Sequence, residues 1–271
     1  MSRSVSVTEV LDEAEDVASR VLGPWGGVLW LSALPLRMLQ IHFLDRLAFL
    51  GEDAPQYGRH LGELALLTTA ALVAALAGRV WFVRACTLSL RTGAVPGREV
   101  WAAGAGPMLT YLYVGLFLEA AFVLTAPLVA VAPLLVLLSG LAAATSPLQS
   151  APALVSPWRH LASQLRHLRV CLALLVVFGI ALLLVYVNLY VLFRVGAWAA
   201  GGLPGVDAGA WSGLLDFSNR SFRLLLGAGA ILVVEPFWLA SLVVLVQQSM
   251  SRVSGEDLRI AWQRLRSEAA G

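Results

Sequence analysis

Long apolar stretches alternate with short polar ones along the whole chain. Each stretch is close to the ~20 residues that an α-helix needs to cross the hydrocarbon core of a bilayer. Because lipid offers the backbone no hydrogen bonds, such stretches cross membranes as helices. The stretches lie at roughly residues 25–45, 62–85, 106–126, 128–146, 170–196 and 222–249. The pattern therefore predicts an all-α polytopic membrane protein with six transmembrane helices in three hairpins.

The polar stretches before the odd-numbered spans have an amphipathic pattern. They begin at Ser6, Pro96 and Ser156, and each opens with a residue typical of a helix start. In the first, Ser6 and Glu9 have capping-box spacing, and apolar residues follow at helical intervals. We expect three repeats of an interfacial helix followed by two spans. The predicted parts are a cytoplasmic amphipathic helix in residues 1–24, a membrane domain in 25–250 and a cytoplasmic tail helix in 251–271.

The arginines predict the orientation of the six spans. With the N-terminus inside, twelve arginines fall on the cytoplasmic side and four on the other side, namely Arg46, Arg59, Arg220 and Arg223. Basic residues near span ends favour the cytoplasmic side. The first twenty residues are acidic and lack the apolar core of a cleavable signal. We therefore expect a multi-pass protein with both termini in the cytoplasm.

Composition supports a membrane location and excludes several kinds of chemistry. Hydrophobic residues make up 59% of the chain and charged residues 13%, whereas soluble domains have about a quarter of their residues charged. The net charge of +2 and the lack of a basic patch with aromatics give no indication of nucleic-acid binding. All 19 basic residues are arginine, which excludes a Walker-type lysine or a Schiff-base lysine. We found no nucleophile elbow or zinc-protease motif, so the sequence predicts neither an enzyme nor a cofactor.

Charged side chains inside apolar spans are costly and are usually paired. At 1.5 Å per residue, Glu235 lies about 20 Å and Arg79 about 25 Å from the outer face. By the same count, Arg37 and Glu119 lie about 18 and 20 Å from the cytoplasmic face. We therefore predict two pairs, Glu235 with Arg79 and Glu119 with Arg37. Two further polar residues, Tyr186 and Asn188, fall close to the layer of the second pair.

Pro236 follows Glu235 directly and removes a backbone donor, which frees a carbonyl one turn earlier, near Leu232. A kink there would turn Glu235 toward the bundle interior and Arg79. Three interpretations of the pairs stay open at this point. They lock helices together, they line a pathway for a solute or a proton, or some of their members face the lipid headgroups.

Other polar features favour structural roles. The acidic run of residues 12–16 predicts a solvated helix face, and it would complement the basic stretch of residues 158–169 on the same side of the membrane. In that stretch His160 and His167 are seven residues apart, too far for one metal ion, so we predict no metal site. Trp211, in a glycine-rich outer loop, is typical of a membrane-interface anchor.

The layout of hairpins, interfacial helices and the polar tail "SGEDLRIAWQRL" resembles a loose group of bacterial membrane proteins. This group includes the membrane domain attached to some glycerophosphodiester phosphodiesterases and related multi-pass families of unknown function. The resemblance implies a six-span architecture in a bacterial inner membrane, and it transfers no catalytic residue, because the catalytic barrel of those enzymes is a separate domain.

The sequence alone indicates two classes of function. The first is a non-enzymatic scaffold or accessory subunit of a membrane-associated complex, with membrane lipids and a cytoplasmic protein as partners. The alternative is a small-solute or lipid transporter that uses the buried Arg, Glu and Tyr side chains.

Overall fold

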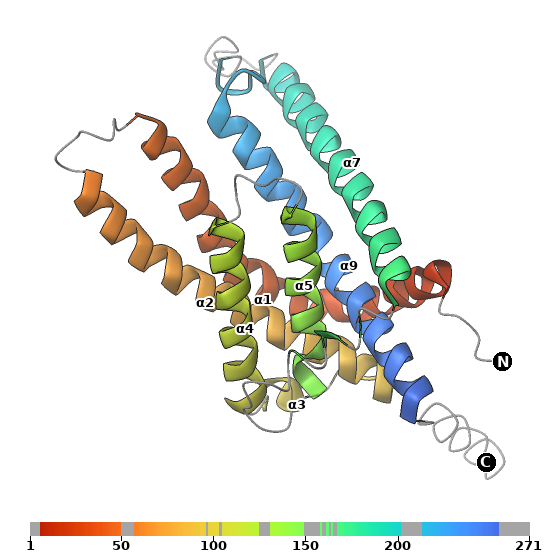
Figure 1. Cartoon of the computed structure of the whole chain (residues 1–271). Coiled ribbons are helices and arrows are strands. Elements are labelled where there is room, and N and C mark those ends of the chain that lie inside the picture. The colour runs from red at the N-terminus through yellow and green to blue at the C-terminus, as the bar shows by residue number, and fades with distance from the viewer. Residues whose placement is uncertain are drawn as a thin grey trace. The chain divides into compact units, whose positions relative to one another are not determined.

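The computed structural model describes residues 6–49, 57–95, 97–102, 105–124, 131–148, 158, 161–162, 164, 167–201 and 213–254. In this part of the chain the secondary structure is helical, with no strand, which confirms the predicted all-α class. The long helices are α1 (Val7–Phe49), α2 (Tyr57–Thr92), α7 (Leu168–Gly201) and α9 (Arg220–Ser254). The shorter ones are α3 (Gly97–Trp101), α4 (Ala105–Leu124), α5 (Ala132–Thr145) and the 3-10 turn η1 (Ser146–Leu148) (Figure 1).

The chain divides into two compact units, and each long helix contributes a segment to both. Unit 1 comprises Met1–Trp25, Val80–Leu175 and Phe237–Gly271, and unit 2 comprises Gly26–Arg79 and Val176–Pro236. The boundaries in α2 and α9 fall directly after Arg79 and Pro236. Both members of the predicted Arg79–Glu235 pair therefore belong to unit 2.

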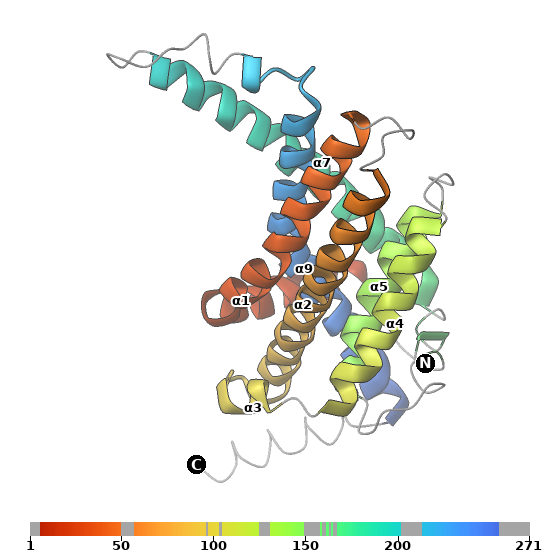
Figure 2. The same ribbon diagram turned by 90° about the vertical axis from the view of Figure 1, so that its left-hand side faces the viewer.

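Unit 1 is built on the C-terminal half of α9, where a continuous run from Leu239 to Val246 is buried. A stripe of α1 is also buried (Val10, Ala14, Val17, Ala18, Val21 and Trp25). Small residues of α5 allow close packing on α9, since a Cβ on Gly140 would stand 2.7 Å from Trp238 Nε1. Helices α4 and α5 lie side by side, as Figures 1 and 2 show, and α4 also contacts η1.

Unit 2 contains a small apolar cluster of α1 and α2 residues, in which Leu36, Ala71 and Ala75 are buried. Next to it, α1 and α2 approach closely where Gly78 meets Ser32. At the other end of the unit, aromatic rings of α7, of the turn before α9 and of the first turn of α9 pack together (Tyr190, Phe193, Phe217 and Phe222). At this end Asn219 caps the N-terminus of α9. Its side chain accepts hydrogen bonds from the Ser221 and Phe222 amides.

Three helices in the described part of the chain are long and apolar enough to cross a membrane. They are Ala65–Thr92, Leu168–Gly201 and Arg220–Met250. These helices correspond to the second, fifth and sixth predicted spans. The other three predicted spans are not among them. The third coincides with α4, of which Met108–Ala121 is a shorter apolar stretch, the fourth with α5, and the first with the middle of α1.

The reasons differ between these segments. Helix α5 has 14 residues and spans about 21 Å, less than the ~30 Å of the hydrocarbon core. Pro35, Arg37 and His42 lower the hydropathy of the α1 segment. Helix α1 also runs unbroken from Val7 to Phe49, so the predicted boundary at residue 24 falls inside a helix. Residues 255–271 of the predicted tail lie outside the described residues.

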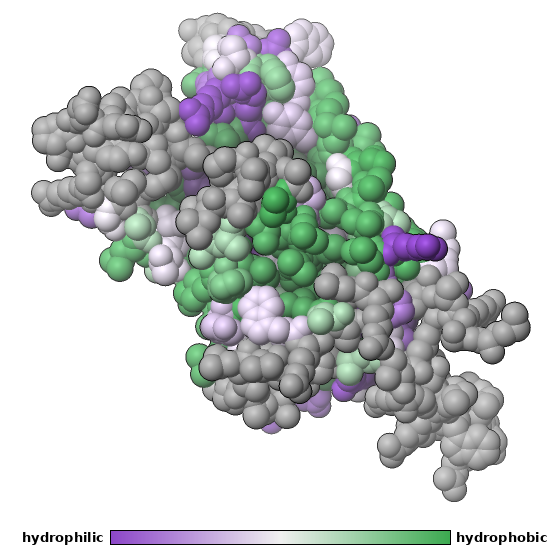
Figure 3. Space-filling model, viewed as in Figure 1, coloured by the Kyte–Doolittle hydropathy of each residue, from purple (hydrophilic) through white to green (hydrophobic). Residues whose placement is uncertain are grey.

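Helix α7 has the surface that a lipid-facing helix requires. Only 11% of its most apolar window is buried inside the protein, compared with 72% for α9. Its exposed apolar side chains include Ile180, Leu183, Leu184 and Leu192. Figure 3 shows apolar side chains gathered over the middle of this face, with hydrophilic ones toward its edges. Because water would make this surface costly, the three apolar helices indicate a membrane protein.

Candidate functional site

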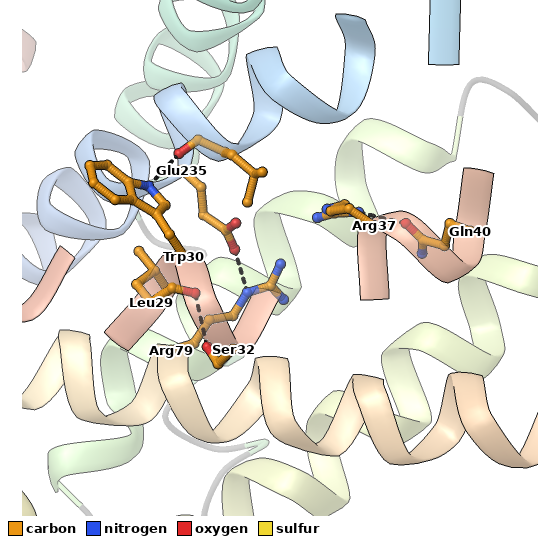
Figure 4. Close-up of polar contacts among 8 residues, drawn as sticks. Leu29, Trp30, Ser32, Arg37, Gln40, Arg79 and Glu235 are labelled. Carbon is orange, nitrogen blue, oxygen red and sulfur yellow. Dashed lines mark hydrogen bonds and ion pairs between the residues drawn. The ribbon is translucent and has the colours of Figure 1, made fainter. Parts of the chain in front are cut away.

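Arg79 and Glu235 form an ion pair near the middle of two of the membrane-length helices. Arg79 Nε donates to Glu235 Oε1 at 2.5 Å, and the two side chains are 16% and 6% exposed. Figure 4 shows Glu235 extending from α9 toward Arg79 on α2. The contact that the similar depths of the two residues predicted is therefore present. A charge in hydrocarbon is costly without a partner, so each residue makes the burial of the other tolerable.

The second oxygen of this carboxylate is in a different situation. Glu235 Oε2 is buried and has no hydrogen-bond donor among the described residues. An ionised carboxylate can accept hydrogen bonds at both oxygens. Glu235 is thus paired through Oε1 and keeps acceptor capacity at Oε2, inside a helical region of high hydropathy.

Pro236 changes the backbone of α9 beside this pair. Proline has no amide hydrogen, so the carbonyl four residues earlier, that of Leu232, loses its helical donor. In the structure the indole of Trp30 on α1 donates to this carbonyl, with Nε1 2.8 Å from the oxygen (Figure 4). The freed carbonyl was predictable from Pro236, but its donor was not, because nothing in the sequence indicates which residue supplies it.

The close approach of α1 and α2 precedes Arg79 by one residue. A Cβ on Gly78 would stand 2.7 Å from Ser32 Cβ and 3.4 Å from the Val28 carbonyl oxygen. The Ser32 hydroxyl itself donates to the Leu29 carbonyl of its own helix at 2.9 Å. The missing side chain of Gly78 therefore lets α1 pack where Arg79 leaves α2. Three helices of unit 2 meet around Glu235 in this way.

The second predicted pair has a different outcome. Arg37 Nη1 donates to Gln40 Oε1 on the same helix at 2.9 Å. Glu119 is half-buried on α4 in unit 1, whereas Arg37 belongs to unit 2, so their pairing stays a prediction. On α7, Tyr186 is half-buried and Asn188 is exposed. Asn188 therefore does not contribute to a buried polar layer within unit 2.

A polar cluster in unit 1 was not predicted from the sequence. Near the C-terminal end of α9, the buried Ser249 hydroxyl donates to Gln164 Oε1 at 2.8 Å. The neighbouring Gln248 donates to Glu13 of α1 at 2.7 Å. The sequence feature that could have indicated this cluster is the polar segment Gln247–Ser249, directly after a long apolar run. These contacts attach both the N-terminal segment of α1 and Gln164 to the C-terminal end of α9.

The acidic face of α1 is largely solvated. Glu9, Asp12, Glu13, Glu15 and Asp16 are all exposed. Asp16 pairs with Arg20 on its own helix at 2.7 Å. Of the predicted basic partners, Arg159 and Arg166 lie outside the described residues, and Arg169 is exposed and forms no ion pair with this face in the described part. Docking on the basic stretch stays a prediction for the residues beyond that part.

Metal and thiol chemistry find no support in the part of the chain that the structure describes. No group of three or more His, Cys, Asp or Glu side chains is arranged to hold a metal ion there. Cys86 and Cys171 are both buried, and neither forms a disulfide. Trp211 and His160 lie outside the described residues.

Comparison with protein-family models, with curated proteins and with solved structures found no match. The resemblance in layout to bacterial six-span proteins therefore stays a prediction. The polar contacts of unit 2 and the exposed acidic face of α1 are the observations from which a function can be argued.

Proposed function

We propose that this chain is a non-enzymatic integral membrane protein that serves as a scaffold or accessory subunit of a membrane-associated complex. The observation that carries the proposal is the Arg79–Glu235 ion pair, because the two charges inside the apolar helices bind one another. A pair of this kind is suited to fastening helices together. The same helix α1 that contributes Trp30 in unit 2 presents exposed acidic side chains in unit 1.

The membrane topology that we propose is the one that the distribution of arginines predicts. Six spans in three hairpins would place both termini, the acidic face of α1 and the tail in the cytoplasm of a bacterial cell, with the protein in the inner membrane. Twelve cytoplasmic arginines against four outside support this orientation. The partner would be a protein with a basic surface at the cytoplasmic face, since the α1 face is acidic.

The experiment is purification in a mild detergent, with identification of the proteins and lipids that elute with the chain. The doubly substituted variant Asp12→Asn with Glu15→Gln removes two exposed charges of the α1 face. The matched control is Asp216→Asn, which removes an exposed acid that the proposed topology places on the other side. We expect a stoichiometric protein partner that is lost from the double variant and retained by the control. Recovery of the chain with lipid alone would contradict the scaffold.

One observation favours a second function, a pathway for a small solute or a lipid. Glu235 Oε2 is a buried acceptor without a donor among the described residues, close to a proline-interrupted segment of α9. Transporters place polar groups and interrupted helices at the membrane midplane in this way. Under this alternative Glu235→Gln would fold normally and lose only transport, whereas under the scaffold it would lose stability.

A further inference from the structure

A proline inside a membrane helix creates a backbone problem that the protein must solve. In α9 the amide that would bond the Leu232 carbonyl is the one that Pro236 lacks. Hydrocarbon offers no substitute donor, so membrane helices tolerate proline when a neighbouring helix or side chain satisfies the freed carbonyl. The donor at the Leu232 carbonyl is therefore expected to matter more than an ordinary surface hydrogen bond.

Trp30 supplies this donor from a helix 202 positions away in the sequence. Its Nε1 lies 2.8 Å from the Leu232 oxygen, a normal hydrogen-bond length. The indole N–H can donate and cannot accept, so it suits a lone carbonyl. The side chain is 42% exposed, so its ring is not needed to fill a tightly packed core. The specific contribution of Trp30 is its N–H group.

We propose that Trp30 and Pro236 form an interhelical latch, in which the indole of α1 replaces the backbone donor that α9 lacks. Within one turn, α9 is then bound twice in unit 2, by α1 at Leu232 and by α2 at Glu235. The latch holds the proline-containing turn in the geometry that directs Glu235 toward Arg79. Trp30 is thus a positioning residue, which acts on the ion pair through the backbone of α9.

The test is a double-mutant cycle on melting temperature in one detergent. Trp30→Phe keeps an aromatic ring and removes the donor, while Pro236→Ala returns the backbone donor to the Leu232 carbonyl. We expect Trp30→Phe to lower the melting temperature by several degrees in the wild-type background and by less than half as much in the Pro236→Ala background. The matched control is Trp198→Phe on α7, a ring that is 82% exposed, which should change little.

Equal losses from Trp30→Phe in the two backgrounds would overturn the latch, because the loss would then come from the ring and not from its donor. A loss from Trp198→Phe as large as that from Trp30→Phe would overturn it as well. A second measurement needs no change at Pro236, so it decides the question even if Pro236→Ala does not fold. In protein with labelled Trp and Leu, the indole proton whose signal disappears in Trp30→Phe should show a nuclear Overhauser contact to Leu232. Absence of that contact would refute the hydrogen bond itself.

Discussion

Gly78 on α2 and Ser32 on α1 lie so close that no side chain fits between them. A Cβ on Gly78 would stand 2.7 Å from Ser32 Cβ, a separation that Cβ atoms do not adopt. The nearest atom is the Ser32 hydroxyl oxygen, which can rotate away, but the Ser32 Cβ cannot, so the helices themselves would have to move. This contact lies next to Arg79 and fixes where α1 passes the ion pair.

Gly78→Ala is therefore expected to destabilise the protein, although alanine is the better helix former. Overpacking of this kind costs about 1–3 kcal/mol. Gly62→Ala on the same helix is the control, because a Cβ there meets nothing within 4 Å. It should be neutral or stabilising by up to about 1 kcal/mol. Thermal unfolding in one detergent compares the two variants with the wild type.

A second substitution identifies the cause. Ser32→Gly removes the clashing Cβ, so the variant with both Gly78→Ala and Ser32→Gly should recover stability relative to Gly78→Ala with Ser32→Ala, which keeps that atom. Equal stability of the two double variants would show that the clash with Ser32 is not what makes Gly78→Ala unfavourable.

Arg79 and Glu235 should behave as a mutually dependent pair. Removing one partner strands the other charge, at a cost of about 3–5 kcal/mol for a buried pair. We expect Glu235→Gln and Arg79→Gln each to lower the melting temperature, and the double variant to recover much of the loss. Full additivity of the two single effects would show that the residues do not stabilise each other, and Glu235 would then be a candidate for the transport pathway.

The exposed pair Asp16–Arg20 is the internal reference for this measurement. Its side chains are 68% and 36% exposed, and such pairs contribute about 0–1 kcal/mol. The same cycle on Asp16→Asn and Arg20→Gln should thus show a small coupling energy. A coupling as large as that of the buried pair would mean that the cycle reports a general effect of charge removal.

The N-terminal cap of α9 gives a third expectation. Asn219 Oδ1 accepts hydrogen bonds from the Ser221 amide at 3.0 Å and from the Phe222 amide at 3.4 Å. Asn219→Ala should cost about 0.5–2 kcal/mol, whereas Asn219→Asp, which can also cap, should cost little. Thermal unfolding and amide exchange at Ser221 and Phe222 check both variants. Identical behaviour of the two would contradict a capping role.

The sequence predicts well those features that depend only on the spacing of residues along a helix. Depth along a helix depends only on the rise per residue, so Arg79 and Glu235 can be paired from their positions in the sequence alone. The membrane-length helices are likewise visible as long apolar runs. The buried stripe of α1 follows from helical spacing.

Other features depend on contacts that hydropathy does not encode. Pro236 indicates a missing donor, but the chain has nine tryptophans, and only the packing of α1 on α9 in unit 2 selects Trp30. The closeness of Gly78 and Ser32 depends on how two helices cross. Helix α5 begins at Ala132, four residues after the predicted start of the fourth span at 128, and this leaves α5 short. An apolar run shows where a chain is apolar but not where its helix ends.

The number of spans can be decided by labelling, provided that the right positions are chosen. Spans formed only by α2, α7 and α9 would place Arg91, Ser163 and Glu268 on one side and Asp53 and Asp207 on the other, as six spans would. The two arrangements differ at Ser4 and at Ala126. With six spans Ser4 is cytoplasmic and Ala126 is outside; with three, the two positions exchange sides relative to Glu268.

We expect the six-span result, because three spans would place Arg3, Arg20 and Arg37 outside and reduce the arginine excess to ten against seven. The measurement is reaction of single introduced cysteines with a membrane-impermeant maleimide in intact cells. Cys86 and Cys171 are buried, so the unsubstituted protein should label little and serve as the background. Ala126→Cys should react from outside together with Asp207→Cys, while Ser4→Cys and Glu268→Cys should react only after the cells are opened. Reaction of Ser4→Cys from outside, with Ala126→Cys protected, would establish the three-span arrangement and remove the acidic face of α1 from the cytoplasmic side, where the scaffold requires it.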